Sequence, residues 1–487
     1  MNVQHRKTWK NHLGNQAIQP LRLYAPESLD DVVGLVREAE RSRCTVRAVG
    51  SGHSWSDVAL TPGFLVDTSR LSRILDLEPQ LLRSGVDAAR LVRAEAGIRL
   101  RELNAHLDAH GLALSNMGGY DGQTVAGVIS TSTHGSGIGF GPLPEQIRSL
   151  DLVAGGGAVY HIERGDGPTD PAAFVQRYPE RRLVQDDDWF SATVVGMGCM
   201  GVIYAAMLAV EQKYWLKEVR VLRSWREVRA DLRAGDVLRD NRHYEFLFNP
   251  YEVDGTHQCL VTTRNKTAEP VGKPKDKLER HPLSEIFASL PITAKIMHLL
   301  FDWLPKLTPE FINRMALEGL VDDEYTNVSY KVLNIGAANK LPAYSMEIAV
   351  PRDRAAEAVE LVMAIAEQHR RVGEVYETAP VSVRFVKASD AFLSMMQGRD
   401  TAMLELIMVG GTEGGFELLG AYEEALYALS GRPHWGQVNY LTEDLVRSMY
   451  PRFDDWLRVR ERLDPQGTFD SPFTKRVGIS RRGFPPG

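Results

Sequence analysis

The chain has 487 residues, of which 57 are Lys or Arg and 63 are Asp or Glu, so its formal net charge is −6. A composition of 44% hydrophobic and 25% charged residues is that of a globular protein with a buried core, which excludes intrinsic disorder, collagen-like and low-complexity sequence. The length predicts two or three domains. The sequence pI of about 6.1 gives no basic footprint, so we expect no nucleic-acid partner.

The first half of the chain alternates short apolar runs with helical patterns. Ser28 can cap a helix over residues 29–41, because apolar residues recur there at helical spacing. A second helix is predicted at residues 100–110, and residues 164–171 have the composition of a loop. The same pattern predicts strands at residues 45–49, 64–67, 91–96 and 202–210, the last of which would close a first domain.

The second half begins near Tyr214 and predicts an α+β domain with a largely antiparallel sheet. Strands are predicted at residues 243–250, 258–263, 344–350, 380–386 and 404–409, and helices at residues 354–368 and 416–430. Residues 264–281 are rich in Lys and Pro, and residues 283–320 are apolar at helical spacing. We interpret the latter as a packed helical hairpin; the alternative is a lid for an apolar substrate or a shallow membrane contact.

The cysteines and the termini predict the cellular compartment. Cys44, Cys199 and Cys259 are far apart and form no CxxC motif, which argues against a disulfide framework and against a structural zinc site. The thirteen histidines show no ligand spacing, so we expect no metal. Residues 1–20 lack the apolar stretch of a secretory signal. The longest apolar stretch, residues 286–304, is interrupted by a proline and two charged residues, so it does not predict a transmembrane helix. We therefore predict a cytoplasmic protein without membrane contact.

The first glycine-rich segment, GSGHSWS at residues 50–56, directly follows a predicted strand. Its glycines permit close backbone approach and Ser51 and Ser54 add donors, so the turn suits a phosphate or a cofactor. His53 would be held at that surface. The alternative is a tight turn with an incidental histidine.

Two further glycine-rich segments follow. Residues 118–141 are mostly small or hydroxylated and leave few side chains to pack, which favours an extended ligand lying along the backbone over a surface loop. Residues 196–201, GMGCMG, match GxGxxG formally. A strand follows this motif instead of preceding it, so we do not predict a Rossmann-type NAD site.

Five motifs, in order and spacing, resemble the vanillyl-alcohol-oxidase superfamily, in its branch of sugar-lactone oxidases (gulonolactone and arabinonolactone oxidases) and alditol oxidases. They are RAVGSGHSWSD at residues 47–57, VAGVISTSTHGSG at 125–137, the cap-domain landmarks HYEF, EIAVP and VRF that begin at His243, Glu347 and Val383, PHWG at 433–436, and the C-terminal YPRF and LDPQGTF. The resemblance runs from about residue 18 to 475 and fails only in residues 264–330.

The resemblance implies an α+β, two-domain FAD-linked oxidase fold. A PCMH-type FAD-binding domain would span residues 1–212, a substrate-binding cap with the insert 264–330 would span 213–430, and residues 431–487 would return to the flavin. It implies FAD bonded through its 8α-methyl to His53, by a single link because residues 118–122 hold no cysteine. The other residues that would hold FAD by this resemblance are Gly50, Ser51, Gly52, Ser54, Gly118, Gly119, Thr124, Gly127, Thr131, Thr133, His134, Gly198 and Ile203.

The resemblance also implies the reaction: a C–H bond beside a hydroxyl delivers hydride to flavin N5 while the hydroxyl loses its proton. Such a site needs a cation near the flavin and a proton acceptor. Arg384 matches the family's arginine. Relatives carry Glu and Lys where this chain has Ser382 and Gln437, and the alditol branch carries His where it has Glu405. Glu405 or His434 could accept the proton; alternatively Glu405 only pairs with Arg384 or Arg399.

We therefore predict a covalent-FAD oxidase that acts on a CH–OH group of a sugar lactone, polyol or related alcohol. Because Gly118 and Gly119 have no side chain to block O2, the expected acceptor is O2 and the expected product hydrogen peroxide. The alternatives are a flavin dehydrogenase that uses a quinone or protein acceptor, and a flavin-binding protein without turnover. The substrate and the oligomeric state are left open by the sequence.

Overall fold

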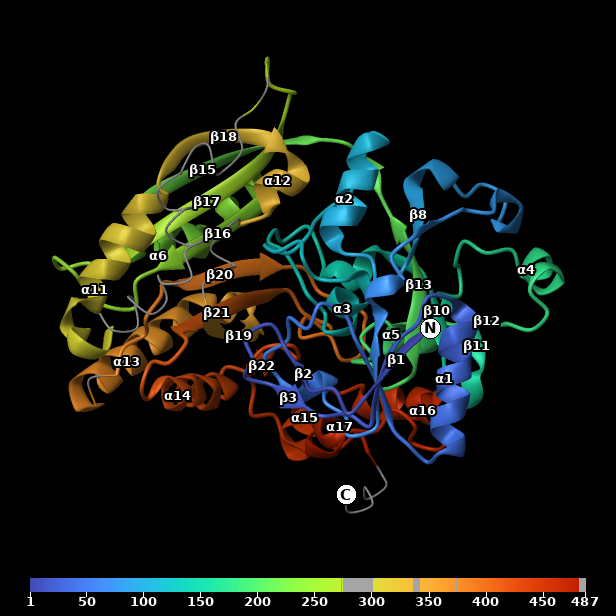
Figure 1. Cartoon of the computed structure of the whole chain (residues 1–487). Helices are drawn as coiled ribbons and strands as arrows, with labels where there is room; N and C mark the ends of the chain where they lie inside the picture. The colour runs from blue at the N-terminus through green and yellow to red at the C-terminus, as the bar shows by residue number, and fades with distance from the viewer. Residues whose placement is uncertain (273, 275–300, 336–341, 374, 481–487) are drawn as a thin grey trace.

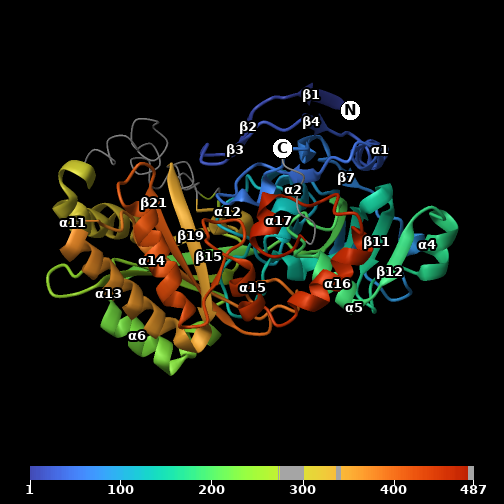
Figure 2. The ribbon, with the colours of Figure 1, turned by 90° about the horizontal axis from the view of Figure 1, so that it is seen from below.

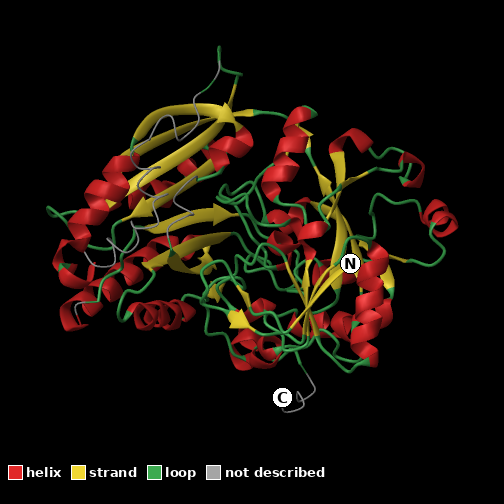
Figure 3. Cartoon of the chain, in the orientation of Figure 1, coloured by secondary structure: helices red, strands yellow, loops and turns green. Residues whose placement is uncertain are grey.

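The computed structural model describes residues 1–272, 274, 301–335, 342–373 and 375–480. Figure 1 shows two lobes, with one large sheet and its helices on the left and two smaller sheets on the right. Helices and strands are present in both lobes (Figure 3), as the prediction of an α+β fold requires.

A small sheet of four strands opens the chain. Its order is β1 (Asn2–His5), β4 (Arg22–Ala25), β6 (Phe64–Asp67) and β5 (Val46–Val49). β4, β6 and β5 run parallel, which requires a crossover between β4 and β5. Helix α1 (Leu29–Arg41) provides it, and the side chain of Ser28 caps this helix by accepting a hydrogen bond from the N–H of Asp31.

A second sheet of six strands forms the body of this lobe. Its order is β12 (Arg182–Gln185), β11 (Val159–Glu163), β10 (Ile147–Val153), β13 (Val202–Ala209), β8 (Leu91–Glu95) and β7 (Ile74–Leu75). Four helices belong to it: α2 (Leu100–Ala109), α3 (Val125–Ser130), α4 (Pro171–Arg177) and α5 (Asp187–Thr193). Two strand pairs stand apart, β2 (Trp9–Lys10) with β3 (Ala17–Ile18) and β9 (Leu112–Ala113) with β14 (Glu211–Gln212).

The other lobe is built on an eight-stranded sheet in which every neighbouring pair is antiparallel. The order is β18 (Asp322–Val328), β15 (Trp215–Ser224), β17 (Gln258–Thr267), β16 (His243–Phe248), β20 (Val381–Val386), β21 (Thr401–Val409), β19 (Ala343–Pro351) and β22 (Arg432–Pro433). The described helices here are α6 (Trp225–Ala234), α7 (Asp236–Asp240), α11 (Thr308–Phe311), α12 (Ser329–Leu333), α13 (Ala355–Gly373) and α14 (Gly415–Tyr427). The antiparallel cap sheet is therefore confirmed.

The two faces of this cap sheet have opposite character. Alternate residues of the central strands, such as Phe246 on β16 and Val383 on β20, are buried against Val359 of α13 and Leu418 of α14 in one apolar cluster. The intervening residues of the same strands include Glu245 and Arg384, which face the first lobe, as shown below. A β-strand sends successive side chains to opposite faces, so this alternation directs a polar surface toward the other lobe.

The C-terminal helices return to the first lobe. Figure 2 shows α15 (Glu443–Met449), α16 (Phe453–Leu463) and α17 (Pro472–Arg476) beside the first-lobe elements. The indole of Trp456 donates to the carbonyl of Val195 at 3.3 Å, and Arg476 pairs with Asp57 at 2.6 Å. Residues of α15, α16 and α17 share an apolar cluster with β8, β10 and β13. The last part of the chain thus completes the first core.

Most predicted elements agree with the structure to within a few residues, and three differences are informative. Residues 125–130 form a helix with Val125, Val128 and Ile129 buried, so the expectation of a segment with little side chain to pack is wrong there. β17 continues to Thr267 and residues 322–328 form β18, so the expected insert overlaps two strands of the sheet. Residues 283–300 of the predicted helical hairpin lie outside the described residues, and its remainder contains helix α11. Among the described helices, none is long and apolar enough to cross a membrane.

Candidate active site

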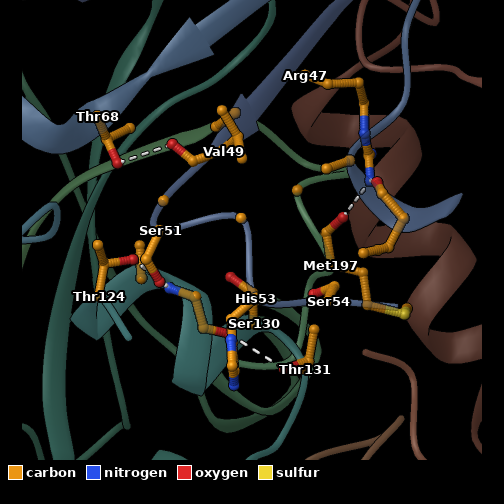
Figure 4. Close-up of a pocket in the computed structure, with 18 of the residues that line it drawn as sticks. Arg47, Val49, Ser51, His53, Ser54, Thr68, Thr124, Ser130, Thr131 and Met197 are labelled. Carbon is orange, nitrogen blue, oxygen red and sulfur yellow. Dashed lines mark hydrogen bonds between the residues drawn. The ribbon is translucent and has the colours of Figure 1, made fainter. Parts of the chain in front are cut away.

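A cavity in the first lobe brings together most of the residues that the sequence assigns to the cofactor (Figure 4). Those that line it are Gly50, Ser51, Gly52, His53, Ser54, Thr124, Gly127, Thr131, Gly198 and Ile203. Four do not line it: Gly118, Gly119, Thr133 and His134. His134 instead lies among the residues of the cap sheet, which are described below.

The loop after β5 presents backbone donors to this cavity. Within the described part of the chain, no protein acceptor takes the N–H of Ser51, Gly52, His53 or Ser54. Gly52 has a φ of +67°, which glycine adopts without strain. Successive free N–H groups of this kind bind anions. The pyrophosphate of FAD fits such a loop.

Close packing fixes the glycine that opens this loop. A Cβ atom on Gly50 would lie 2.0 Å from Oγ1 of Thr124, so no larger residue fits. The same hydroxyl caps α3 by accepting a hydrogen bond from the N–H of Gly127. The first two glycine-rich segments therefore meet at one point of the cavity wall, as their shared assignment to the cofactor predicts.

His53 is largely buried in this wall and surrounded by rings. It stacks on Tyr120 with 4.5 Å between the ring centroids, and it lies 5.0 Å from His12 and 5.2 Å from Trp55. Burial, and secondarily the charge of His12, lowers the pKa of His53 to about 4. At neutral pH the imidazole is therefore uncharged, and one ring nitrogen carries a free lone pair.

Arg47 is a structural residue of the cavity that the sequence analysis missed. Its guanidinium is buried (Figure 4) and donates to the carbonyls of Val58, Met197 and Phe469, of which the Met197 bond is 2.6 Å long. These carbonyls belong to three separate segments of the chain. An arginine inside the glycine-rich motif was the available signal, but its partners are too distant in sequence to be predicted.

The third glycine-rich segment is the turn between α5 and β13. Gly198 has a φ of +69° and Gly201 a φ of +148°, and a Cβ on Gly201 would lie 2.5 Å from the carbonyl oxygen of Val153. The glycines thus serve a tight turn at the cavity wall. This agrees with the prediction that the GxGxxG pattern is not a Rossmann motif.

The cap sheet places a cluster of charges opposite the first lobe. Arg384 lies 3.0 Å from Glu405, 3.7 Å from Glu245 and 3.8 Å from Glu347. Glu245 also pairs with Arg264 at 2.7 Å. Glu405 is the partner of Arg384 on the next strand, which is one of the two arginine contacts that the sequence analysis left open for it.

Ser382, buried on β20, faces Glu405 directly across the strand pair. The other oxygen of Glu405 accepts a hydrogen bond from Ser345 Oγ at 3.2 Å. Arg384 and Glu405 remain partly exposed, at 16% and 17% of their side-chain surface.

Glu347 joins this charge cluster to the two other segments. Its carboxylate lies 3.1 Å from Nε2 of His134 and accepts a 3.4 Å hydrogen bond from the amide of Gln437, while its backbone carbonyl accepts from the N–H of His434 at 2.8 Å. Burial would raise the pKa of Glu347, but His134, His434 and Arg384 outweigh it and lower the pKa to about 2. Glu347 and Glu245 are charged residues within otherwise apolar strands, and this signal could have identified them.

His434 is held in one tautomer. The N–H of Gly436 donates to Nδ1 of His434 at 3.0 Å, so the neutral ring carries its hydrogen on Nε2. Burial lowers the pKa of His434 to about 4. His434 is thus a hydrogen-bond donor and not a base at neutral pH. A Cβ on Gly436 would lie 3.3 Å from Ser54 Oγ, which places this segment against the cavity loop.

The two glycines expected to leave a path for O2 differ in their surroundings. A Cβ on Gly119 would lie 3.2 Å from the side chain of Ile335, which already occupies that space. A Cβ on Gly118 would lie 3.3 Å from the carbonyl oxygen of His134 and from Thr133 Cγ2. Only a small side chain fits at Gly118.

Comparison with known proteins identifies the family of this chain. The profile of D-arabinono-1,4-lactone oxidase matches residues 206–477, and that of an FAD-binding domain matches residues 20–163. L-gulono-1,4-lactone dehydrogenase of Mycobacterium tuberculosis is 30% identical over 470 residues, which are 96% of this chain and 98% of the relative. L-gulonolactone oxidase of Mus musculus is 28% identical over 96% of this chain and 98% of the relative.

A more distant relative and a solved structure complete the comparison. Alditol oxidase of a Streptomyces strain is 26% identical over 96% of this chain and 97% of the relative. A crystal structure of cholesterol oxidase from B. sterolicum superposes with a TM-score of 0.77 at 16% identity, over 98% of this chain and 97% of that one, and so shares the fold. The predictions of the superfamily branch, of FAD and of an FAD-dependent oxidoreductase are confirmed. The chain belongs to the D-arabinono-1,4-lactone oxidase family of FAD-dependent enzymes.

Proposed function

We propose that this enzyme oxidises a CH–OH group of a neutral sugar lactone, polyol or related alcohol, with O2 as acceptor and hydrogen peroxide as product. The observation that carries the proposal is the position of Arg384 and Glu405. They are a partly exposed cation and a partly exposed carboxylate, 3.0 Å apart, on one face of the cap sheet. The His434–Gln437 segment connects this face to the cofactor cavity. The oxidase names of several relatives support the choice of acceptor.

Bound FAD supplies the two-electron acceptor for the hydride that leaves the substrate carbon. The loop 50–54 would hold its pyrophosphate through free N–H groups, with Thr124, Gly127, Thr131, Gly198 and Ile203 along the rest of the cavity. Gly118, Gly119, Thr133 and His134 would lie on its far side, toward the cap sheet.

Arg384 and Glu405 have different roles in the proposed reaction. Arg384 would stabilise the negative charge that the bound cofactor acquires with the hydride. It is suited to this role because its guanidinium keeps its charge at all relevant pH values. Glu405 accepts the hydroxyl proton, since His434 carries a hydrogen on its free nitrogen and can only donate. Ser382, Gln437 and His434 would orient the substrate's remaining hydroxyl groups.

We also propose His53 as the covalent anchor of FAD. Its uncharged imidazole at the cavity wall has the lone pair that such a bond requires. One C–N bond replaces a methyl C–H and the imidazole N–H, and the two electrons and two protons released pass finally to O2. After acid precipitation the polypeptide should retain flavin fluorescence on a denaturing gel, and His53→Ala should lose it. Flavin released entirely into the supernatant of the wild type would refute the anchor.

An anaerobic flavin-bleaching screen across lactones, alditols, oligosaccharides and apolar alcohols tests the function. Bleaching by lactones or polyols supports the proposal, and bleaching by no alcohol would favour a flavin-binding protein without turnover.

A dehydrogenase is the second candidate, because Ile335 fills the space beside Gly119 and one relative is named a dehydrogenase. Stopped-flow mixing of reduced enzyme with oxygenated buffer decides between them. Reoxidation over minutes together with prompt reaction with a quinone would establish the dehydrogenase.

We also propose the limits of three segments of the chain and a cytoplasmic location. The two lobes, and the C-terminal helices packed on the first, support a division into residues 1–212, 213–430 and 431–487. The three cysteines, Cys44, Cys199 and Cys259, are all free, which supports a reducing, cytoplasmic compartment.

A further inference from the structure

A short hairpin near the start of the chain supports the cofactor loop from outside. This N-terminal hairpin, residues 9–18, consists of β2, β3 and the turn between them, and it lies at the junction of the two lobes (Figure 1 and Figure 2). Its strands pair through two residues each and with no other strand of the described chain. A two-stranded hairpin of this size is marginally stable in water on its own, so contacts with the rest of the protein must order it.

Four donors of the N-terminal hairpin bind three backbone carbonyls of the loop that follows β5. They are the N–H of His12 to Gly52 at 2.8 Å, the side-chain amide of Asn11 to Ser54 at 2.9 Å, and the side-chain amides of Asn15 and Gln16 to Trp55 at 2.9 and 3.0 Å. Trp9 adds an apolar contact: its ring lines the cavity, and a Cβ on Gly52 would lie 3.1 Å from its Cζ2. The hairpin is therefore both the outer support of the loop and part of the cavity wall.

These bonds fix the direction in which the peptide groups of the loop point. In a trans peptide, the C=O of one residue and the N–H of the next point in opposite directions. The bond from His12 to the carbonyl of Gly52 therefore turns the N–H of His53 away from the hairpin. Within the described chain no protein acceptor takes that N–H, and His53 lines the cavity. The hairpin thus leaves the donors of the loop available to a ligand in the cavity.

Asn11 joins the hairpin to the loop. Its side chain is buried, with the residue 7% exposed, and both ends of its amide are used. Oδ1 accepts a hydrogen bond from the N–H of Gln16 at 3.1 Å. Nδ2 donates to Oδ1 of Asn15 at 2.6 Å and to the carbonyl of Ser54. One side chain therefore closes the hairpin turn and fixes it to the loop, which requires the acceptor and the two donors of an amide.

We propose that the N-terminal hairpin is part of the FAD site and that Asn11 is its positioning residue. By holding the carbonyls of the loop, the hairpin presents the free N–H groups to the pyrophosphate and keeps His53 at the cavity wall for its bond to the flavin. The effect on FAD affinity rests on the assignment of this loop to FAD, and the effect on the covalent bond rests on the proposed anchor. Since such coupling is reciprocal, bound FAD should in turn order the hairpin.

FAD titration of a protein that cannot form the covalent bond tests the positioning of the loop. In His53→Ala the FAD can dissociate, so flavin fluorescence reports its affinity. Adding Asn11→Asp keeps the acceptor for Gln16 but removes the donor to the carbonyl of Ser54, and Asn11→Ala removes both without adding charge. We expect each to weaken FAD binding about tenfold, the effect of one lost hydrogen bond to a buried carbonyl.

The matched control is Gln19→Glu in the same His53→Ala protein. It makes the same change from amide to acid on an exposed residue just after the hairpin, and it should leave FAD affinity within twofold. FAD affinity within twofold of the parent in both Asn11 variants would overturn the proposal.

Hydrogen exchange in the wild-type chain tests the reciprocal effect without any substitution. The N–H of His12, which bonds to Gly52, should exchange more slowly in the holoenzyme than in apoenzyme made under riboflavin limitation, while the N–H groups of α1 serve as the reference. Exchange at His12 that FAD leaves unchanged would contradict the proposal.

The rate of covalent attachment separates positioning from a purely structural role. At saturating FAD, Asn11→Ala apoenzyme with an intact His53 should form the covalent bond about tenfold more slowly than wild-type apoenzyme. A lower melting temperature with unchanged FAD affinity and unchanged attachment rate would reduce the hairpin to a structural element and refute the proposal. If the wild type releases all of its flavin, the covalent anchor fails, and FAD titration of the wild-type background still decides the role of Asn11. Because none of these readouts needs a substrate, failure of the bleaching screen would refute the proposed function alone.

Discussion

Replacing Arg384 with Met tests the centre of the site, because this one guanidinium lies within 3.0–3.8 Å of three carboxylates. Loss of one preorganised electrostatic contact slows catalysis by roughly 10²–10³-fold, about 2.7–4 kcal/mol of transition-state stabilisation. We expect a loss of this order in the rate of flavin reduction by substrate. Sulfite affinity should fall as well, since the adduct also places negative charge on the ring.

The same substitution should lower stability, for a reason that can be separated from catalysis. Glu405 would lose its 3.0 Å partner while it faces Glu347 across the strand pair. Breaking a buried ion pair costs about 3–5 kcal/mol; with both side chains 16–17% exposed, we expect about 2–3 kcal/mol here. The double variant Arg384→Met/Glu405→Gln removes the unpaired charge, so it should regain most of the lost stability and still reduce flavin slowly.

Anaerobic stopped-flow reduction, sulfite titration and thermal melting measure the three effects. Arg384→Lys is the matched control, because it keeps the charge but loses the planar guanidinium, which can donate several hydrogen bonds at once. If reduction rate and sulfite affinity both stay within twofold of wild type in Arg384→Met, the arginine is not at the flavin. If the double variant melts no higher than the single one, Glu405 is not the group that loses its partner.

Three further predictions test other parts of the molecule. Gly118→Ala would place a Cβ 3.3 Å from the carbonyl oxygen of His134. In stopped-flow measurements it should slow reoxidation by O2 more than it slows reduction. Loss of flavin content instead would mean that Gly118 serves only the backbone turn in which it lies. Arg47→Met leaves the carbonyls of three segments without their donor, at a cost of about 1–3 kcal/mol for each buried carbonyl. The melting temperature and the flavin-to-protein absorbance ratio should therefore both fall. Unchanged values would mean that Arg47 does not hold these segments together. Glu377 is fully buried, and burial raises its pKa well above the usual value. The native state therefore keeps the proton that the unfolded state loses above about pH 4.3. Stability should therefore fall as pH rises, by about 1.4 kcal/mol per pH unit, and Glu377→Gln should remove this slope, giving a melting-temperature advantage that grows between pH 5 and 7; equal slopes in both proteins would contradict it.

The sequence was informative wherever a signal is local. The cap of α1 at Ser28 and the strand at residues 64–67 agree with the structure, because a cap and a short apolar run each depend only on neighbouring residues. The roles of Arg47 and Glu347 were not predicted, because each residue acts through partners from several distant segments. The helix at residues 125–130 was missed for a different reason. Its glycine, its serine and its β-branched residues have weak helical propensity, and burial of Val125, Val128 and Ile129 against the first core supplies the stability instead.

The departures from the family pattern also become intelligible once the strands are paired. Taken along the chain, Ser382 in place of Glu removes an acid, and Glu405 in place of His adds one at an unrelated position. In the sheet the two positions are direct cross-strand partners, and Glu405 lies 3.0 Å from Arg384. Cross-strand neighbours occupy the same face of a sheet, so a carboxylate on either strand can reach the same guanidinium. The site therefore retains an arginine–carboxylate pair while the acid approaches from β21, and Ser382 leaves a smaller, uncharged group on the β20 side. Sugar specificity should differ from that of relatives at the substrate group that faces this side, although the arginine–carboxylate pair is kept.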